Sequence, residues 1–124
     1  MMTRGSNHAK KFGKWGEDRA QEWLEKRGYE LVARNFHTEY GEIDLVMQKE
    51  NCLHFVEVKT RRTKRFGNPE EAVTETKMAH MVDSAQRFLQ LHPEFSGDWQ
   101  IDVMAIYASP KRQPLEIRWI ENVA

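Results

Sequence analysis

The stretch Leu53-His54-Phe55-Val56-Glu57-Val58-Lys59 decides the fold of this chain, because it predicts a strand that is apolar on both faces yet ends in two opposite charges. An unpaired ion is costly to bury, so the two charges must pair or bind something. Side chains alternate along a strand, which places Glu57 and Lys59 on the same face.

Gly41-Glu42-Ile43-Asp44-Leu45 predicts a second apolar strand with an acid inside it. The polar link at 48–51 is short enough for this strand to fold back antiparallel beside the strand of Glu57. Asp44, Glu57 and Lys59 then converge at one edge of a sheet. Two carboxylates beside an amine suit a hard divalent cation and phosphodiester hydrolysis.

Length and composition set the limits. The 124 residues predict a single domain over 1–124, and a formal net charge of zero excludes a whole-surface field for polyanions, so any nucleic-acid affinity needs a local patch. The single cysteine, Cys52, excludes a disulfide framework and a cysteine-rich zinc site and indicates a reducing compartment. With no signal-like apolar start and no long apolar run, we expect a cytoplasmic protein without a membrane partner.

Hydrophobic periodicity predicts the element order αβββαββ, with a helix on each side of a sheet. The polar, basic segment 1–11 is expected to be loosely ordered. The expected helices cover 13–27 and 76–92, the expected strands cover 29–35, 43–47, 52–59, 101–107 and 115–119, and 60–71 is expected to be a loop.

Glu17 adds a third acid at the border of the apolar stripe of the first helix. Gly13 and Gly16 each cost about 1 kcal/mol inside a helix, which indicates close approach of another backbone or a ligand. The alternative is a frayed helix start with Glu17 near the positive end of the helix dipole.

Several motifs in a fixed order resemble the YraN-like family of uncharacterised bacterial proteins, and the resemblance covers almost the whole chain. They are Gly13-x-x-Gly16-Glu17, Arg34-Asn35-Phe36, Gly41-Glu42-Ile43-Asp44-Leu45, Phe55-Val56-Glu57-Val58-Lys59-x-Arg61, Phe66-Gly67-x-Pro69 and Lys77. That family is similar in its core to archaeal Holliday-junction resolvases and to the restriction-endonuclease-like superfamily, whose signature is an aspartate followed by Glu-x-Lys. The resemblance implies an α/β fold with a central mixed sheet flanked by helices.

The resemblance also implies a site. Asp44, Glu57 and Lys59 match the signature, and Glu17 corresponds to the acid of the superfamily's first helix, so these four are the expected catalytic residues. Asp44, Glu57 and the backbone carbonyl of Val58 are the expected ligands of Mg²⁺ or Mn²⁺. We expect Lys59 to hold the attacking water or stabilise growing negative charge rather than to act as a general base. The alternative is a structural ion-pair network at a strand end.

A basic run begins where the strand of Glu57 ends. Arginines suit bidentate phosphate contacts, so this run and Lys77 are the expected nucleic-acid contacts, with DNA favoured over RNA. The alternatives are an ordinary solvated charged face and, for Lys77, a lysine that merely flanks the helix stripe. The run consists of Arg61, Arg62, Lys64 and Arg65.

Other polar residues have simpler explanations. The five histidines show no metal-ligand spacing and are expected at the surface or in the core. Asp102 is either an accessory site acid or a buried, hydrogen-bonded structural group, and Glu42 is a weaker candidate than Glu17 for the acidic cluster. The family often has an arginine just before the late strand's Phe-Asp-Val, whereas Gln100 precedes Ile101-Asp102-Val103 here.

Three functions remain open. The first is a metal-dependent endonuclease that hydrolyses phosphodiester bonds, with branched DNA as the substrate that the resemblance suggests. The second is a nucleic-acid-binding module without turnover, and the third is a protein-interaction subunit anchored by an exposed Trp99 or Trp119. A homodimer is also open, because junction-cleaving relatives act as dimers on a two-fold symmetric substrate.

Overall fold

The computed structural model describes residues 4–62, 73–108 and 116–124 and confirms an α/β fold with the order αβββαββ. This is the restriction-endonuclease-like arrangement, a five-stranded mixed sheet with two helices. Its elements are α1 (Arg4–Glu25), β1 (Glu30–Thr38), β2 (Gly41–Lys49), β3 (Cys52–Arg61), α2 (Glu75–Leu91), β4 (Asp98–Tyr107) and β5 (Glu116–Ile120).

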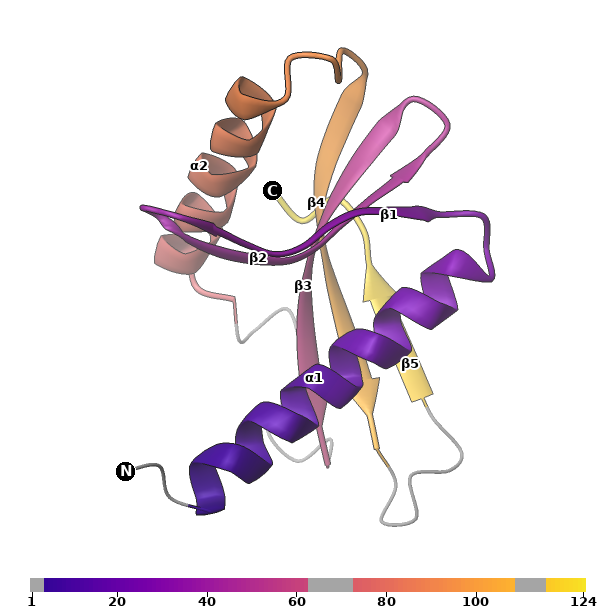
Figure 1. Cartoon of the computed structure of the whole chain (residues 1–124), viewed down its shortest axis with the longest axis vertical. Helices are drawn as coiled ribbons and strands as arrows, with labels where there is room; N and C mark the ends of the chain where they lie inside the picture. Colours follow the sequence, from indigo (N-terminus) through magenta and orange to yellow (C-terminus); the bar gives the residue numbers. More distant parts are fainter. Residues whose placement is uncertain (1–3, 63–72, 109–115) are drawn as a thin grey trace.

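The strands lie in the sheet in chain order, β1-β2-β3-β4-β5 (Figure 1). β3 and β4 are parallel, and every other neighbouring pair is antiparallel. Parallel neighbours need a long crossover, and α2 lies in the connection between β3 and β4. The antiparallel pairing of β2 and β3 confirms the expected return of Asp44's strand beside that of Glu57.

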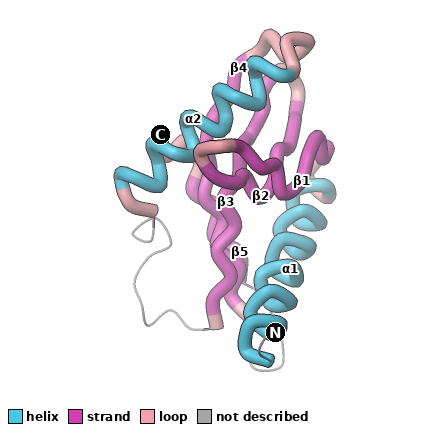
Figure 2. The backbone as a smooth tube through the Cα atoms, turned by 60° about the vertical axis from the view of Figure 1, so that its left-hand side comes forward, coloured by secondary structure: helices cyan, strands magenta, loops and turns pink. Residues whose placement is uncertain are grey.

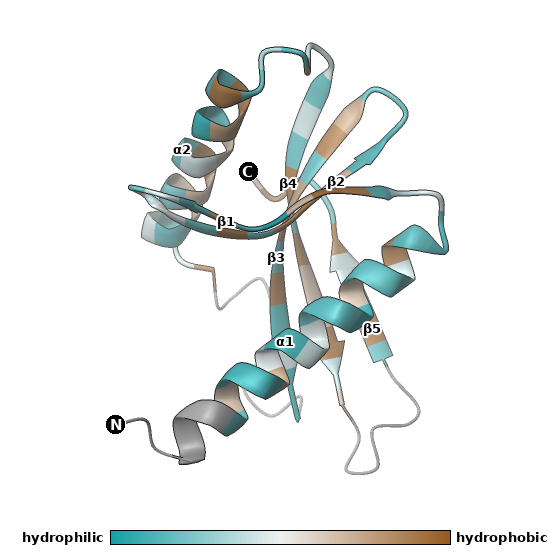
Figure 3. Ribbon diagram, viewed as in Figure 1, coloured by the Kyte–Doolittle hydropathy of each residue, from teal (hydrophilic) through white to brown (hydrophobic). Residues whose placement is uncertain are grey.

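The two helices cover opposite faces of the sheet (Figure 2). Side chains alternate along β3 and β4, so each face supplies its own core. Val56 and Met104 pack with Leu24 of α1, whereas Phe55 and Ile101 pack with residues of α2. Figure 3 shows the apolar residues concentrated along the central strands, with hydrophilic residues on the turns.

The helix bounds depart from the sequence pattern at one end. α1 begins at Arg4, so it includes most of the segment expected to be loosely ordered. The loop expected at 60–71 begins later, because β3 continues to Arg61, and the rest of that loop lies outside the described residues. No helix in the described ranges combines the length and the apolarity that a membrane span requires.

Candidate active site

Asp44 sits where the pairing of β2 and β3 ends. Leu45 opposes Val56 in the last pair of this register, so one further step would place Asp44 opposite Glu57. Instead, the backbone N–H of Val58 donates to Oδ2 of Asp44 over 2.8 Å. The side chain of Asp44 thus takes a β3 backbone donor, which fixes the carboxyl group against the strand that carries Glu57.

The electrostatics of Asp44 are unfavourable to its charge. Burial, then repulsion from Glu57, raise the pKa of Asp44 from 3.8 to about 7, and the charges of Glu17 and Glu42 act in the same direction. The hydrogen bond from Val58 opposes these effects without overcoming them. Within the described residues, Asp44 forms no ion pair with a cationic side chain.

Glu57, in contrast, is a buried carboxylate with two ammonium partners. Its Oε1 lies 2.8 Å from Nζ of Lys77 and 3.3 Å from Nζ of Lys59. Burial and the neighbouring Lys77 lower the pKa of Lys59. Burial also acts to lower the pKa of Lys77, but its contacts with Glu57 and Lys59, together with the charges of Glu57 and Asp44, raise it overall. The structure therefore brings Lys77 from α2 into the site. This lysine is the neighbouring cation that acts on the pKa of Lys59.

Gly16 explains how α1 comes close to this edge. A Cβ at Gly16 would overlap the side chain of Thr60 on β3, so a glycine is needed where the helix crosses the strand. Gly13 meets nothing within 4 Å at its Cβ position. Close approach is found only at Gly16, where the neighbour is a side chain of β3 and not the expected backbone or ligand.

Glu17 follows Gly16 but is paired elsewhere. Its Oε1 lies 3.4 Å from Nη2 of Arg34 and accepts a hydrogen bond from Nδ2 of Asn35 over 3.2 Å. Glu17, Asp44 and Glu57 do not form a group of three whose ligand atoms all lie within 4.8 Å of one another. Glu17 thus contributes charge to the site from its rim, and the motif residues Arg34 and Asn35 hold it there.

Only part of the basic run can be placed. Arg61 is half-buried at the end of β3, and the exposed Arg62 lies with Cζ 4.0 Å from the ring centre of Phe12. This stacking ties the start of the run to α1. Lys64 and Arg65 lie outside the described residues.

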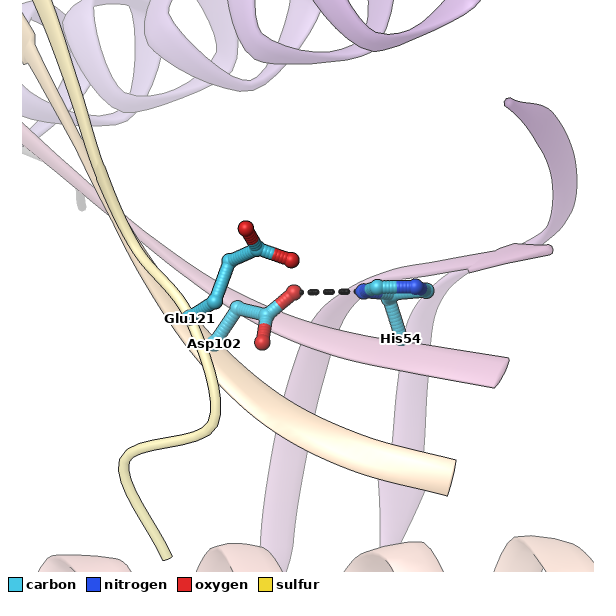
Figure 4. A group of neighbouring side chains, drawn as sticks. All are labelled: His54, Asp102 and Glu121. Atoms are coloured by element: carbon cyan, nitrogen blue, oxygen red, sulfur yellow. Dashed lines mark hydrogen bonds and ion pairs between the residues drawn. The ribbon is translucent and has the colours of Figure 1, made fainter. Parts of the chain in front are cut away.

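A second polar cluster lies on the other face of the sheet, as the alternation of Asp102 with Ile101 and Val103 requires (Figure 4). The ligand atoms of His54, Asp102 and Glu121 lie within 4.8 Å of one another, so this group could hold a metal ion. Among the described residues it is the one group of three or more His, Cys, Asp or Glu side chains that lie close enough together to hold a metal ion. Its members come from β3, β4 and the chain after β5, so no regular spacing in the sequence predicts the cluster.

Asp102 of this cluster is fully buried and hydrogen-bonded. Nδ1 of His54 lies 2.7 Å from its Oδ2, and Gln100 and the backbone of Asn122 donate to Oδ1 over 2.8 and 2.9 Å. Trp119 donates its indole N–H to Oδ2 over 3.2 Å. Of the two alternatives for Asp102, the structure thus supports the structural one, and Gln100, at the family's arginine position, is part of the same network.

The two tryptophans offered as exposed anchors are instead half-buried. Trp99 packs against Phe55 with ring centres 5.8 Å apart, and Trp119 packs edge-on against Trp23 at 5.6 Å. Trp119 packs against the core between the sheet and α1, and Trp99 packs against the core between the sheet and α2. The expectation of an exposed tryptophan anchor is therefore wrong.

Comparison with known proteins agrees with the motifs. The model of the uncharacterised protein family UPF0102 matches residues 16–106. A UPF0102 protein from Syntrophomonas wolfei is 47% identical over 97 residues, which cover 78% of this chain and 84% of that protein. A UPF0102 protein from Caldicellulosiruptor saccharolyticus is 40% identical over 113 residues, covering 91% of this chain and 96% of the relative. These matches confirm the YraN-like resemblance, and the chain belongs to the uncharacterised protein family UPF0102.

Proposed function

We propose that this protein is a divalent-metal-dependent endonuclease that hydrolyses phosphodiester bonds in DNA. The observation that carries the proposal is the pair Asp44 and Glu57 at the end of the β2–β3 ladder, where one acid has two lysine partners and the other has none among the described residues. A carboxyl group whose pKa rises to about 7 beside a second acid is typical of a functional site.

The donor set fits Mg²⁺ or Mn²⁺, which prefer carboxylate and carbonyl oxygens. Asp44 and Glu57 would supply one carboxylate each, and Val58 would supply its backbone carbonyl. In an extended strand, the N–H and C=O of one residue point to the same side, and the N–H of Val58 already points to Asp44. When bound, the cation polarises the phosphoryl group and lowers the pKa of a coordinated water.

The side chains around these ligands have distinct roles in the proposal. Lys59 orients the attacking water or stabilises the negative charge that grows on the phosphate. Lys77 holds Glu57 in place, and its hydrogen bond with Lys59 adds to burial in lowering the pKa of Lys59. Glu17 acts from the rim, and Glu42 adds negative charge near Asp44.

Affinity for DNA is assigned to the basic run Arg61, Arg62, Lys64 and Arg65. These side chains follow directly from the strand that carries Glu57 and Lys59, so a phosphate backbone held by them would pass the site. Contacts of this kind read the backbone and not the bases, so binding should fall steeply with salt.

The test is cleavage of branched, flapped and linear DNA with Mn²⁺ by the wild type, Lys59→Ala and Asp44→Asn. Lys59→Ala should lower the cleavage rate by about a hundredfold or more while affinity stays nearly intact, because a transition-state contact appears in rate and not in binding. Lys26→Met, which removes an exposed lysine just beyond the far end of α1, is the matched control and should change neither quantity.

Replacing Arg61, Arg62, Lys64 and Arg65 with alanine should have the opposite effect. Binding should weaken uniformly across sequences, and its salt dependence should flatten by up to about one unit of slope per lost contact. If Lys59→Ala loses binding as badly as this variant, Lys59 is another phosphate contact. If the wild type cleaves no form of DNA or RNA, the endonuclease proposal is wrong.

A non-catalytic nucleic-acid-binding module is the second candidate. The contacts of Glu57 with Lys59 and Lys77 favour it, since an ion-pair network would make the same contacts. Such a module gains nothing from Asp44, whose charge would repel a phosphate. DNA affinity that is unchanged or raised in Asp44→Asn, together with absent cleavage in the wild type, would select this second function.

A further inference from the structure

A cavity of about 360 Å³ opens between the β1–β2 turn and the first half of α2. Tyr40 and Glu42 line it from the turn and β2, and Lys77, His80 and Met81 line it from α2. Figures 1 and 2 both show this turn beside α2. Its volume falls in the range of about 300–1,000 Å³ that small-ligand pockets occupy.

The cavity adjoins the proposed reacting centre. Lys77 lines it, and Nζ of the same residue lies 2.8 Å from Oε1 of Glu57. A group bound in the cavity would therefore lie one side chain away from Glu57.

The lining suits a planar, partly polar ligand better than a phosphate. Met81 provides a buried apolar floor, while Tyr40 is 44% exposed. Thr74 and Thr76 add hydroxyl groups, and Lys77 is the one lysine or arginine among the described lining residues. An aromatic ring beside apolar and hydroxyl groups suits a nucleobase, which stacks on an aromatic ring and forms hydrogen bonds at its edge.

The turn that carries Tyr40 is held firmly. The hydroxyl of Thr38 accepts from the backbone N–H of Tyr40 and donates to the carbonyl of Gly41, each over 3.0 Å. The same hydroxyl lies 2.9 Å from that of Ser84, a buried residue of α2. Gly41, at φ 144, adopts a conformation that other residues rarely do. An exposed aromatic ring on a fixed backbone loses little freedom when it stacks on a ligand.

A second hollow of about 710 Å³ lies on the α1 side and has the opposite chemistry. Lys10, Lys14 and Arg34 line it, together with the rim acid Glu17. Glu42 lines both hollows, so they meet beside Asp44's strand. The cationic hollow suits the phosphate backbone, and the tyrosine-lined cavity suits a base.

From this arrangement we infer that the cavity at Tyr40 receives one unpaired nucleotide next to the scissile phosphate, so that the substrate is a strand with an unstacked base at the cleavage site rather than a continuous duplex. The inference rests on the proposed function for the position of the cleavage, but binding of the base can be tested without turnover. An unpaired base costs less to extrude than a paired one, which gives the selectivity a physical basis.

The test uses DNA with 2-aminopurine, a fluorescent base whose emission changes on stacking, at the first unpaired position of a flap. A second dye at the far end reports binding by anisotropy, in metal-free buffer and in an Asp44→Asn background that cannot cleave. Tyr40→Ala should weaken flap binding by about tenfold and abolish the 2-aminopurine change, while duplex affinity stays within about twofold. Tyr40→Phe should retain both, and Leu91→Ala, an exposed apolar residue at the far end of α2, should behave as wild type.

The outcomes separate this inference from the proposed function. If bound flap and bound duplex give the same 2-aminopurine signal, if Tyr40→Ala weakens both alike, or if no DNA binds, the nucleotide cavity is refuted. Displacement by free adenosine monophosphate as effective as by the oligonucleotide would also overturn it, because the cavity would then hold a small nucleotide. If the wild type cleaves flap and duplex equally, the cavity is refuted and the hydrolase stands. If selective binding depends on Tyr40 but nothing is cleaved, the cavity stands and the hydrolase fails.

Discussion

Asp44→Asn should stabilise the metal-free protein at alkaline pH. In the fold, burial and repulsion from Glu57 raise the pKa of Asp44 from 3.8 to about 7. Because the folded pKa lies above the unfolded one, this carboxyl group favours the folded state most below pH 3.8. Its contribution is lost as the pH rises to 7. An asparagine keeps the acceptor for the N–H of Val58 and removes the charge.

The size of the effect follows from the same shift. A rise from 3.8 to about 7 corresponds to about 4 kcal/mol at most, and relaxation around a half-buried group reduces this to about 1–3 kcal/mol. For a chain of 124 residues that is a rise in Tm of about 3–5 °C per kcal/mol. The difference between variant and wild type should be small at pH 4 and largest above pH 7.

Thermal and urea unfolding can measure both the effect of pH and the effect of the metal on stability. The measurements are made at pH 4 and pH 8, in chelator and in about 10 mM Mn²⁺. With a dissociation constant of about 0.1–1 mM, the metal should stabilise the wild type by about 1.4–2.7 kcal/mol at pH 8. It should not stabilise Asp44→Asn. Asp98→Asn, an exposed aspartate at the start of β4, is the charge-matched control.

Two results would refute this reasoning. A loss of stability in Asp44→Asn at pH 8 without metal would mean that the ionised carboxylate is a structural acceptor and not a repelled charge. If Mn²⁺ stabilised the wild type and Asp44→Asn equally, the metal would bind at another site. Loss of the response in Glu121→Gln would place it at the His54 cluster instead.

Glu57→Gln should lower the free energy of unfolding of the metal-free protein by about 1–3 kcal/mol, because Lys59 and Lys77 share this carboxylate. In a double-mutant cycle, adding Lys77→Met should recover part of this loss. Unchanged stability in Glu57→Gln would show that the two contacts contribute nothing. Gly16→Ala should lower the stability of the protein by about 1–3 kcal/mol, because the added methyl group overlaps Thr60. Gly13→Ala should raise the stability by about 0.5–1 kcal/mol. Equal urea midpoints for the two variants would contradict the close crossing of α1 and β3. Asp102→Ala should cost about 3 kcal/mol or more, because its donors lose a fully buried acceptor, yet cleavage per folded molecule should not change. A specific loss of cleavage would restore Asp102 as a site acid.

The sequence predicts the fold well because its signals are local. The helical spacing from Met78 to Leu89 records the buried face of α2. The alternation over 101–107 correctly indicates a strand, although the structure buries both faces of β4. The short link at 48–51 favours antiparallel pairing of β2 with β3. The sequence pattern does not predict the start of α1 for the same reason, because the sequence over 4–11 has no apolar stripe.

The missing parts of the site are long-range contacts. Whether Lys77 reaches Glu57 depends on how α2 packs on the sheet, and spacing along the chain does not encode that. The pairing of Glu17 with Arg34 and Asn35 depends on the depth at which α1 crosses β3, which Gly16 sets. His54, Asp102 and Glu121 meet only because β3, β4 and the chain after β5 lie side by side.

The distribution of partners among the acids is the strongest reason to regard this edge as more than an ion-pair network. Glu17 has Arg34, and Glu57 has Lys59 and Lys77. A network that served only stability would pair Asp44 as well, because even a half-buried carboxylate without a cation is costly. Yet Asp44, with its raised pKa, receives only a backbone N–H from β3 among the described residues. An asparagine would keep that bond without the charge, so the aspartate is consistent with the cation proposed between Asp44 and Glu57.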